Sequence, residues 1–274
     1  MDDVFQKSAE EYDPRGRLDP AGFARSDSFQ TWTPPTDLAP LIEHGWCVSW
    51  AGIDSPFHNE EVMHRPYVDL FVDDSGAGIQ GTFRQRRRYV AARAGRVVGL
   101  RFRPGSFTAI WSQPVTSLQD RVLELPDVFP MVSAELPRQV RQADPEAAIE
   151  LLFTFVRSLA PRPDPRIETV NRIIAAVERD ETLVTVSAVA EACQRSERWV
   201  QQLFRDYTGI GLKWFLRRVR LLAIARAIRD DPDPDWADLA YRFGYASQQH
   251  FNTEFKAEIG RTPRQYWRDP GIRD

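Results

Sequence analysis

Arginine and glutamine side chains line one side of the segment SERWVQQLFRDYTG at residues 196–209. Its apolar residues recur at spacings of three and four: Val200, Leu203, Phe204 and Tyr207. That spacing predicts a helix with one buried stripe. The opposite side carries the polar residues Glu197, Arg198, Gln201, Gln202 and Arg205. Because arginine suits guanine and glutamine suits adenine in bidentate hydrogen bonds, this side is suited to reading base edges in DNA.

The residues at the two ends of this segment predict where the helix begins and ends. Ser196 is a good N-cap, since its hydroxyl can accept a hydrogen bond from an otherwise unpaired amide of the first turn. Gly209 is a good stop, because glycine adopts a positive φ without steric cost. We therefore expect the helix to lie between them.

The same pattern returns 51 residues later, in SQQHFNTEFKAEIG at residues 247–260. The shift superposes the serines, the apolar residues and the glycines: Ser196 on Ser247, Val200 on Phe251, Phe204 on Phe255 and Gly209 on Gly260. The outward residues of the second segment are Gln248, Gln249, Asn252, Thr253 and Lys256. One such helix alone is typical of any protein surface, whereas the duplication indicates a pair of DNA-reading helices.

Small residues ahead of each segment predict two helix-turn-helix units. Ala190 and Ala240 allow two helices to cross closely. Gly244 supplies the second turn, but Gln194 stands at the equivalent place in the first. That glutamine must accept a left-handed conformation, or the turn must differ. The stretch GLKWFLRRVRLLAIARAI predicts a long helix joining the units, which can then place two helices in successive major grooves.

From Ile167 to Arg268 the chain resembles the AraC/XylS family of transcriptional regulators. The resemblance rests on the paired units, the long linking helix and the closing segment GRTPRQYW. It implies that the first unit dominates base reading and that the second adds reading or backbone contacts. By position, the family's base-contacting sites fall on Arg198, Gln201, Gln202, Arg205, Gln248, Gln249, Asn252 and Thr253. Many members carry a basic residue where Thr253 stands, so the second helix is expected to contribute less affinity here.

The distribution of charge agrees with a DNA-binding surface, although the total charge does not. The 274 residues carry a formal net charge of −3. Between Arg195 and Arg229, however, nine basic residues stand against Glu197 and Asp206. Positive charge is therefore concentrated on the first outward helix and the linking helix, where it can meet phosphates. Four arginines could each lie on a solvated helix face: Arg217, Arg218, Arg226 and Arg229. We expect some of these four to form structural salt bridges and not to contact phosphates.

Cysteine usage and the first residues predict a cytoplasmic protein. Only Cys47 and Cys193 occur, so no disulfide framework is expected and a reducing compartment fits. The first twenty residues are acidic and polar and lack the apolar core of a signal peptide. No stretch approaches the ~18 apolar residues of a membrane span, so no membrane partner is expected.

The N-terminal half predicts a mixed domain after a polar start. Residues 1–28 are rich in charge and poor in aliphatic side chains, which predicts a mobile arm. Runs rich in aromatic and β-branched residues predict strands at 45–50, 67–72, 79–84 and 96–102. Helices are expected at about 106–112, 127–136 and 145–159. The last of them is apolar on a broad face, which indicates packing in a bundle or at a dimer interface.

These elements predict a fold of two domains. Residues 29–159 would form an α+β sensor or dimerisation domain, built as a small β-barrel or as a sheet with helices. The proline-rich residues 160–166 would be a short, stiff linker. Residues 167–270 would form an all-α DNA-binding domain, with two helix-turn-helix units joined by a long helix.

The stretches LAPLIEHGW, RPYVDLFVDD and VVGLRFRPGSF resemble the sensor-like region that precedes this DNA-binding domain in many bacterial regulators. The resemblance implies an effector-binding β-barrel. The aromatic residues of this half would line either a ligand cavity or a plain core. The ligand-binding candidates are Trp46, Trp50, Phe71, Phe83, Phe102 and Trp111. A plain core is the default interpretation, although a small barrel with this many aromatic residues often has room for a flat apolar ligand.

Three other clusters have simpler interpretations. The spacing of His58, Glu60, Glu61 and His64 matches no familiar metal site and is typical of a polar loop. The run at 84–88 (RQRRR) could bind an anionic effector, but a charged edge strand or turn is favoured. Some relatives of this family carry a cysteine that accepts alkyl groups from damaged DNA, which requires a cysteine cluster on zinc. Cys47 stands alone, and no Ser/His/Asp arrangement, phosphate-binding glycine loop or paired-carboxylate motif stands out, so we expect no enzyme activity. We also expect no metal and no cofactor.

Taken together, the residues predict a transcriptional regulator of the AraC/XylS type that reads two successive major grooves. Its partners would be double-stranded promoter DNA, a small-molecule effector on the N-terminal domain, RNA polymerase if it activates, and a second copy in a homodimer. The alternative is a ligand-independent dimeric regulator. A regulator that accepts alkyl groups on a cysteine is disfavoured.

Overall fold

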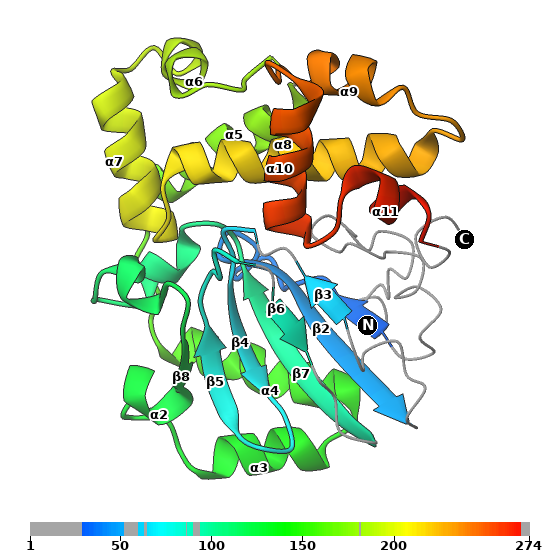
Figure 1. Cartoon of the computed structure of the whole chain (residues 1–274). Helices are drawn as coiled ribbons and strands as arrows, with labels where there is room; N and C mark the ends of the chain where they lie inside the picture. The colour runs from blue at the N-terminus through cyan, green and yellow to red at the C-terminus, as the bar shows by residue number, and fades with distance from the viewer. Residues whose placement is uncertain are drawn as a thin grey trace.

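The computed structural model describes residues 29–51, 60–62, 65–85, 87–89, 94–180 and 182–269. Strands and helices occupy residues 29–158, which we call the sheet region, and helices alone occupy residues 165–269, which we call the helical region. Figure 1 shows the helical region lying across one end of the sheet region. The order is the predicted one, an α+β part followed by an all-α part. The arm expected at 1–28 lies outside the described residues.

Six antiparallel strands form the main sheet, in the order β1-β2-β7-β4-β5-β8. They are β1 (Phe29–Trp32), β2 (Ile42–Ala51), β4 (Val68–Val72), β5 (Ala77–Gln80), β7 (Ala94–Phe102) and β8 (Val122–Glu124). A separate pair is formed by β3 (Glu60–Val62) and β6 (Arg87–Tyr89). Because β1 and β8 are the two edges of the main sheet, the described strands form an open sheet with helices, which is the second of the two predicted alternatives.

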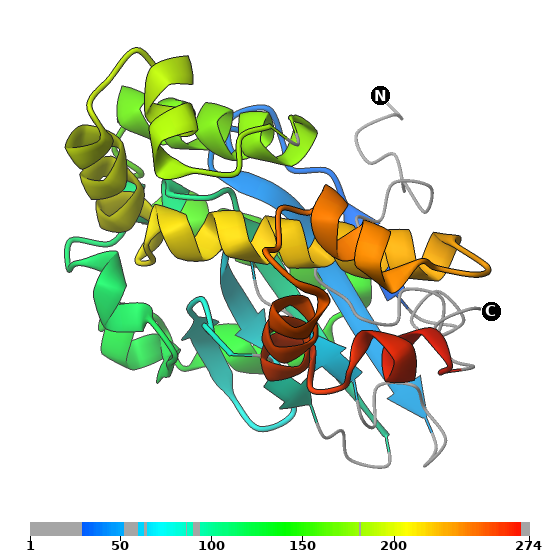
Figure 2. The same ribbon diagram turned by 45° about the horizontal axis from the view of Figure 1, so that its top comes forward.

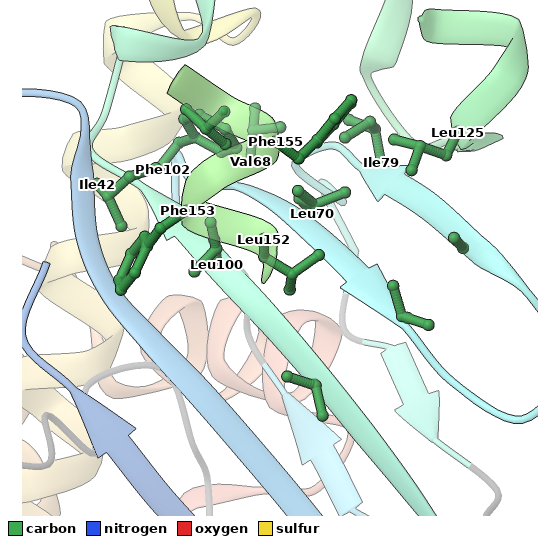
Figure 3. Close-up of a cluster of buried hydrophobic side chains, with 14 of the residues drawn as sticks. Ile42, Val68, Leu70, Ile79, Leu100, Phe102, Leu125, Leu152, Phe153 and Phe155 are labelled. Carbon is green, nitrogen blue, oxygen red and sulfur yellow. The ribbon is translucent and has the colours of Figure 1, made fainter. Parts of the chain in front are cut away.

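One face of this sheet is covered by α4 (Pro145–Ser158). The helix begins on Asp144, whose carboxylate accepts from the amide of Ala147 at 3.0 Å. Figure 3 shows Leu152 and Phe153 of α4 close to Leu70 and Leu100 of the sheet. All four side chains are buried in one core. The predicted helix at 145–159 therefore exists, but its apolar face packs on the sheet and not in a bundle or at a dimer interface.

The end of α3 (Glu135–Gln142) is tied to the same sheet by Arg96 of β7. Its guanidinium donates to the carbonyls of Val140, Arg141 and Ala143, at 3.1, 2.7 and 2.9 Å. These are the carbonyls that the last turn of a helix leaves without an internal partner. A cation at this position also interacts favourably with the helix dipole.

The opposite face of the sheet carries aromatic rings laid over glycines. A Cβ built on Gly99 would lie 2.6 Å from the Trp46 ring, and one on Gly95 would lie 2.6 Å from the Trp50 ring. On Gly78 it would lie 3.1 Å from the Phe71 ring. The rings can lie flat because these cross-strand neighbours have no side chain. We call Trp46, Trp50 and Phe71 the aromatic floor.

Three predictions for the sheet region are wrong in detail. The single helix expected at 127–136 is instead α2 (Leu125–Val128) and α3, separated by a turn. Pro130 lies in that turn and has no N–H with which to continue a helix. The strand expected at 79–84 ends at Gln80. The helix expected at 106–112 is a short 3-10 helix, η2 (Ser106–Ala109), and a second one, η3 (Val115–Leu118), follows.

The helical region contains two small cores that share one helix. Its helices are α5 (Pro165–Arg179), α6 (Val186–Ala192), α7 (Glu197–Thr208), α8 (Leu212–Asp230), α9 (Trp236–Arg242), α10 (Gln248–Ile259) and α11 (Pro263–Trp267). Figure 2 shows α8, coloured yellow to orange, extending from the first unit to the second. Phe215 and Leu216 are buried with α5, α6 and α7, whereas Ile224 and Ile228 are buried with α9, α10 and α11.

The stretch between α4 and α5 includes most of the predicted linker at 160–166. The helix α5 starts at Pro165, so the last two linker residues are its first two residues. Among the described residues, no helix is long and apolar enough to cross a membrane.

Candidate nucleic-acid interface

The two outward helices α7 and α10 are delimited by the same devices. The Ser196 hydroxyl accepts from the amide of Trp199 at 3.2 Å, and the Ser247 hydroxyl accepts from the amide of His250 at 3.2 Å. Gly209 ends α7 with φ 77°, and Gly260 ends α10 with φ 86°. Both predicted caps and both predicted stops are therefore confirmed.

The turns that precede these helices are also the same, despite their different residues. Gln194 has φ 51° and Gly244 has φ 74°, so both residues are left-handed. In the first turn, the amide of Arg195 donates to the carbonyl of Ala190 at 3.0 Å. In the second, the amide of Tyr245 donates to the carbonyl of Ala240 at 2.9 Å. Of the two alternatives for Gln194, the left-handed conformation is the one observed.

The second unit has one more residue between turn and helix. Arg195 is followed directly by the N-cap Ser196, whereas Ala246 separates Tyr245 from Ser247. The two units are therefore equal in their turns and in their helices, but not in the segment that connects them.

Buried aromatic residues hold each outward helix on its unit. Phe204 is fully buried against Phe215, with ring centroids 5.3 Å apart. In the second unit, the centroid of the Phe255 ring lies 5.8 Å from that of Phe251 and 5.6 Å from that of Tyr266. The apolar stripe predicted from the spacing is the stripe that forms these cores.

The predicted base-contacting side chains of α7 face solvent. All four are exposed: Arg198, Gln201, Gln202 and Arg205. The amide of Gln202 donates to the Asp206 carboxylate at 2.7 Å, which leaves the amide oxygen of Gln202 and its second N–H for another partner.

The outward row of α10 is not fully exposed. Gln248, Gln249, Thr253 and Lys256 are exposed, while Asn252 is half-buried. The hydroxyl of Thr253 donates to the Gln249 carbonyl of its own helix at 2.9 Å. One side chain of this row is thus committed to the helix itself.

Each of the two regions of the chain matches a known protein family. Residues 189–269 match the family model described as "Helix-turn-helix domain", and residues 30–124 match "Domain of unknown function (DUF6597)". The HTH-type transcriptional activator RhaR of Yersinia pseudotuberculosis is 30% identical over 105 residues, which cover 37% of this chain and 35% of RhaR. The match therefore spans about a third of that relative.

The regulatory protein SoxS of Salmonella typhimurium is 35% identical over 83 residues, which cover 30% of this chain and 77% of SoxS. The chain belongs to the AraC/XylS family of transcriptional regulators. Among solved structures, the C-terminal domain of the response regulator AraT from Geobacillus stearothermophilus aligns with 27% identity and a TM-score of 0.33, over 36% of this chain and 83% of AraT. ToxT of Vibrio cholerae aligns with 11% identity and a TM-score of 0.36, over 88% of this chain and 98% of ToxT.

Two exposed residues of this AraC-family protein were missed by the sequence reasoning. Arg195 lies over the Trp199 ring, 5.4 Å from its centroid, and Trp199 is 38% exposed. Both flank the start of α7, beside Arg198. The sequence signal was present, since Trp199 does not belong to the buried stripe, but an aromatic residue in a helix suggests a core position first.

The basic residues of α8 divide as expected between structure and surface. Arg217 pairs with Glu254 at 3.2 Å and with Glu258 at 3.0 Å, and Arg220 pairs with Glu254 at 2.9 Å. Burial opposes the charge on Glu254, but attraction to Arg220 and Arg217 outweighs it, so its pKa is lowered. These ion pairs join α8 to α10, which confirms that some arginines here are structural.

Arg218 is the most buried charged side chain of α8, with 1% exposed. Its guanidinium stacks on the Trp214 ring, 4.6 Å from the centroid, and donates to the backbone carbonyl of Arg84 in the sheet region. Burial lowers the pKa of Arg218 to about 10, and attraction to Glu258 opposes that change. The group is therefore still charged near neutral pH.

The six aromatic ligand candidates do not share one surface. Trp46, Trp50 and Phe71 form the aromatic floor, and all three are half-buried. Phe102 is buried on the α4 face, and Trp111 packs against the same core. Phe83 is half-buried in the segment that follows β5. Alternation along β7 explains the place of Phe102, because adjacent residues of a strand point to opposite faces and Gly99, three residues earlier, lies under the Trp46 ring.

The remaining sequence candidates supply no reactive site within the described residues. Burial raises the pKa of the Cys47 thiol to about 11, which is the reverse of activation. No group of three potential metal ligands occurs among the residues that the structure describes. His58 and His64 lie outside those residues. In the arginine run at 84–88, Arg84 pairs with Asp120 at 2.7 Å, while Arg86 lies outside the described residues.

Proposed function

We propose that this AraC-family regulator binds promoter DNA in a sequence-specific manner and reads two successive major grooves, one with α7 and one with α10. The observation that carries the proposal is that the turn, the N-cap and the terminal glycine of α7 are repeated at α10. Equal turns, equal caps and equal stops present two outward rows, one packed on each half of a shared helix. A pair of helices held in this way is the arrangement that can follow the groove over two turns of DNA.

The two helices would contribute unequally. In α7, Arg198, Gln201 and Gln202 are exposed and carry the side chains that suit guanine and adenine. In α10, Thr253 is bonded to its own helix and Asn252 is half-buried. We infer that α7 supplies most of the base reading. Lys256, nearer the end of α10, would contact phosphates.

Selection of bound sequences from genomic DNA tests this proposal. The full-length protein, Arg198→Ala/Gln202→Ala and Gln248→Ala/Gln249→Ala would be compared at physiological salt. A motif with two parts, of which each double variant loses a different one, is the expected result. The selected motif should lose more of its sequence preference with the α7 double variant than with the α10 double variant. Enrichment of no motif by the full-length protein would refute sequence-specific reading.

The sheet region supports a second proposal, that a flat apolar effector binds on the aromatic floor. Stacked rings favour planar ligands. The indole Nε1 of Trp46 is buried and has no hydrogen-bond partner among the described residues, so it could donate to one acceptor of the effector. Nearby, Arg101 and Asp69 form a bidentate pair at 2.9 and 2.9 Å and so neutralise each other. An uncharged or weakly polar effector fits this surface.

A matched pair of tryptophans tests the effector proposal. Like Trp46, Trp111 has a buried Nε1 for which the described part of the chain offers no partner, but it belongs to the core on the other face. A panel of planar conjugated compounds would be screened for saturable thermal stabilisation. Trp46→Phe should weaken the response by about tenfold in Kd, while Trp111→Phe should leave Kd unchanged. If no compound stabilises the protein, the ligand-independent dimeric regulator becomes the favoured alternative.

A further inference from the structure

The sheet region is docked directly on the first helix-turn-helix unit. A Cβ on Gly209, at the end of α7, would lie 2.8 Å from the carbonyl of Val115 in η3. The side-chain amide of Asn171 in α5 donates to the carbonyl of Pro104 at 3.0 Å. The backbone of the sheet region thus touches both α5 and the end of the first outward helix.

A tether inside the sheet region fixes one further contact. The backbone amide of Arg84 donates to one oxygen of the Asp120 carboxylate at 2.7 Å, and its Nε donates to the other oxygen at 2.7 Å. The amide of Asp120 in turn donates to the carbonyl of Thr82 at 3.0 Å. Asp120 therefore holds the backbone of Arg84 in place, and with it the direction of the Arg84 carbonyl.

That carbonyl faces α8. It accepts a hydrogen bond from the Trp214 indole Nε1 at 3.3 Å and another from Arg218 Nη2. A single carbonyl of the sheet region is therefore the partner of two side chains on the helix that joins the two DNA-reading units.

Arg218 also lies beside the second outward helix. Its Nη2 is 3.7 Å from the carboxylate of Glu258 in α10, which is too far for a hydrogen bond. Glu258 is held by Arg217 instead, at 3.0 Å. The other terminal nitrogen of Arg218, Nη1, is buried and has no partner among the described residues. The guanidinium is thus hydrogen-bonded to the sheet region, whereas its contact with α10 is an ion pair without a hydrogen bond.

We propose that Arg218 is a positioning residue that couples docking of the sheet region to the placement of α10. While the Arg84 carbonyl is docked, it accepts from Arg218 Nη2, and Glu258 stays with Arg217. When the carbonyl withdraws, Arg218 becomes a buried cation that lacks its acceptor. A buried cation without a hydrogen-bond acceptor is costly, so the guanidinium closes from 3.7 Å to hydrogen-bond distance of the Glu258 carboxylate. That movement draws the second half of α10 toward α8 and turns its outward row.

The coupling rests on the proposed role of α10 in DNA reading, but its first test needs no DNA. Asp120→Gly removes the tether and suits the positive φ of 56° at this position. Hydrogen exchange of the full-length protein would be followed across α10. Asp120→Gly is expected to change the exchange rates there by about tenfold. Asp37→Ala breaks a comparable exposed ion pair of the sheet region, with Arg157 at 2.7 Å, and should leave α10 unchanged.

A second variant loosens the same tether from its other end. Arg84→Ala removes a side chain that is 58% exposed, so folding should be preserved, and a smaller change in α10 is expected. Unchanged α10 exchange in both Asp120→Gly and Arg84→Ala would overturn the proposal. In a Glu258→Gln background, Asp120→Gly should have no effect on α10. An effect that persists there would show that the coupling bypasses the carboxylate, which also overturns it.

The DNA readout is separate. With a selected two-part site, affinity is compared between the intact site and one in which the α10 part is scrambled. Asp120→Gly should change that ratio several-fold, while Asp37→Ala should not. An unchanged ratio despite altered exchange would overturn the link between Arg218 and DNA reading. Failure to select any site would count against the proposed function alone, since the exchange experiment tests the coupling without DNA.

Discussion

At the scale of single residues, Gln194 shows how the first unit differs from the second. It occupies a left-handed position, with φ 51°, where the second unit has Gly244. A non-glycine residue in this conformation costs roughly 1 kcal/mol or more. The turn nevertheless keeps the hydrogen bonds of the glycine turn. The surrounding helices therefore impose the conformation, and the residue carries the strain.

This strain gives a first prediction. Gln194→Gly relieves the strained φ, but glycine also gains conformational entropy in the unfolded chain. The net effect should be a stabilisation of up to about 1 kcal/mol. Denaturant unfolding measures the change. Gln194→Ala, which keeps the Cβ, is the control and should not stabilise. A lower stability for Gln194→Gly would mean that the glutamine side chain contributes contacts that outweigh the strain.

A second prediction at this scale concerns base reading. Arg198→Ala should cost about 1–3 kcal/mol at the selected site and relax the preference at one base position, because the proposed bidentate contact would be lost. Lys256→Ala should instead weaken binding to all sequences alike and lower the dependence on salt. Quantitative binding to specific and random DNA distinguishes them. An equal loss for Arg198→Ala on random DNA would assign this side chain to phosphate.

At the scale of helices and strands, α7 depends on the ring of Phe204. The side chain is fully buried against Phe215. Phe204→Ala should cost about 3–5 kcal/mol by leaving a cavity in the first unit. Trp199→Ala removes an even larger ring from the same helix, but one that is 38% exposed, and should cost much less. Thermal unfolding of the two variants makes the comparison, and equal losses would contradict the assignment of Phe204 to the core.

The start of α5 gives a prediction for acid stability. Burial opposes the charge on the Asp164 carboxyl, but hydrogen bonds from Arg166 and Tyr207 outweigh it and lower its pKa to about 2. Because the folded pKa lies below the unfolded one, the stabilisation is present above about pH 4 and is lost as the pH falls toward 2. It should amount to about 1 kcal/mol, given partial exposure.

Asp164→Asn keeps a capping side chain and removes the titration. The variant should therefore lose less stability than the wild type between about pH 4 and pH 2. Tyr207→Phe, which removes one donor to Asp164, should fall between the two. Unfolding by urea at several pH values measures the slopes. The same slope in wild type and Asp164→Asn would rule out this carboxyl as the source.

Local signals explain which elements the sequence could predict. Ser196, Gly209 and their counterparts Ser247 and Gly260 define α7 and α10 because caps and stops act within one turn of the helix. The helix expected at 127–136 failed because its apolar spacing continued through Pro130, which ends it. The division of the aromatic candidates between two faces follows from alternation, but only once the strand is known.

At the scale of the whole molecule, contacts between the two regions lay beyond the reach of the sequence. The basic run on α8 indicated salt bridges, but not that Arg218 would meet the carbonyl of Arg84, far away in the chain. Such a partner depends on how the regions dock. Docking in turn depends on close backbone approaches, such as that of Gly209 to Val115, which leave no mark in composition or periodicity.

Gly209 gives the prediction that belongs to this scale. Gly209→Ala adds a methyl group that would lie 2.8 Å from the Val115 carbonyl, in addition to the strain of φ 77°. Gly244→Ala has a similar strain, with φ 74°, but has open space around the new methyl group. Gly244→Ala should cost about 1–2 kcal/mol, while Gly209→Ala should cost more and expose the segment before α5 to protease. Equal protease sensitivity of the two variants would argue that η3 does not depend on close contact with α7.

The extra residue Ala246 has a consequence for engineering new specificities. Each outward helix is matched to its own connection, one residue longer in the second unit than in the first. An outward helix moved alone from one unit to the other would be displaced relative to the turn that carries it. The transferable module is therefore the turn together with its helix, residues 190–209 or 240–260, and chimaeras built from the helices alone should misalign their base-reading rows.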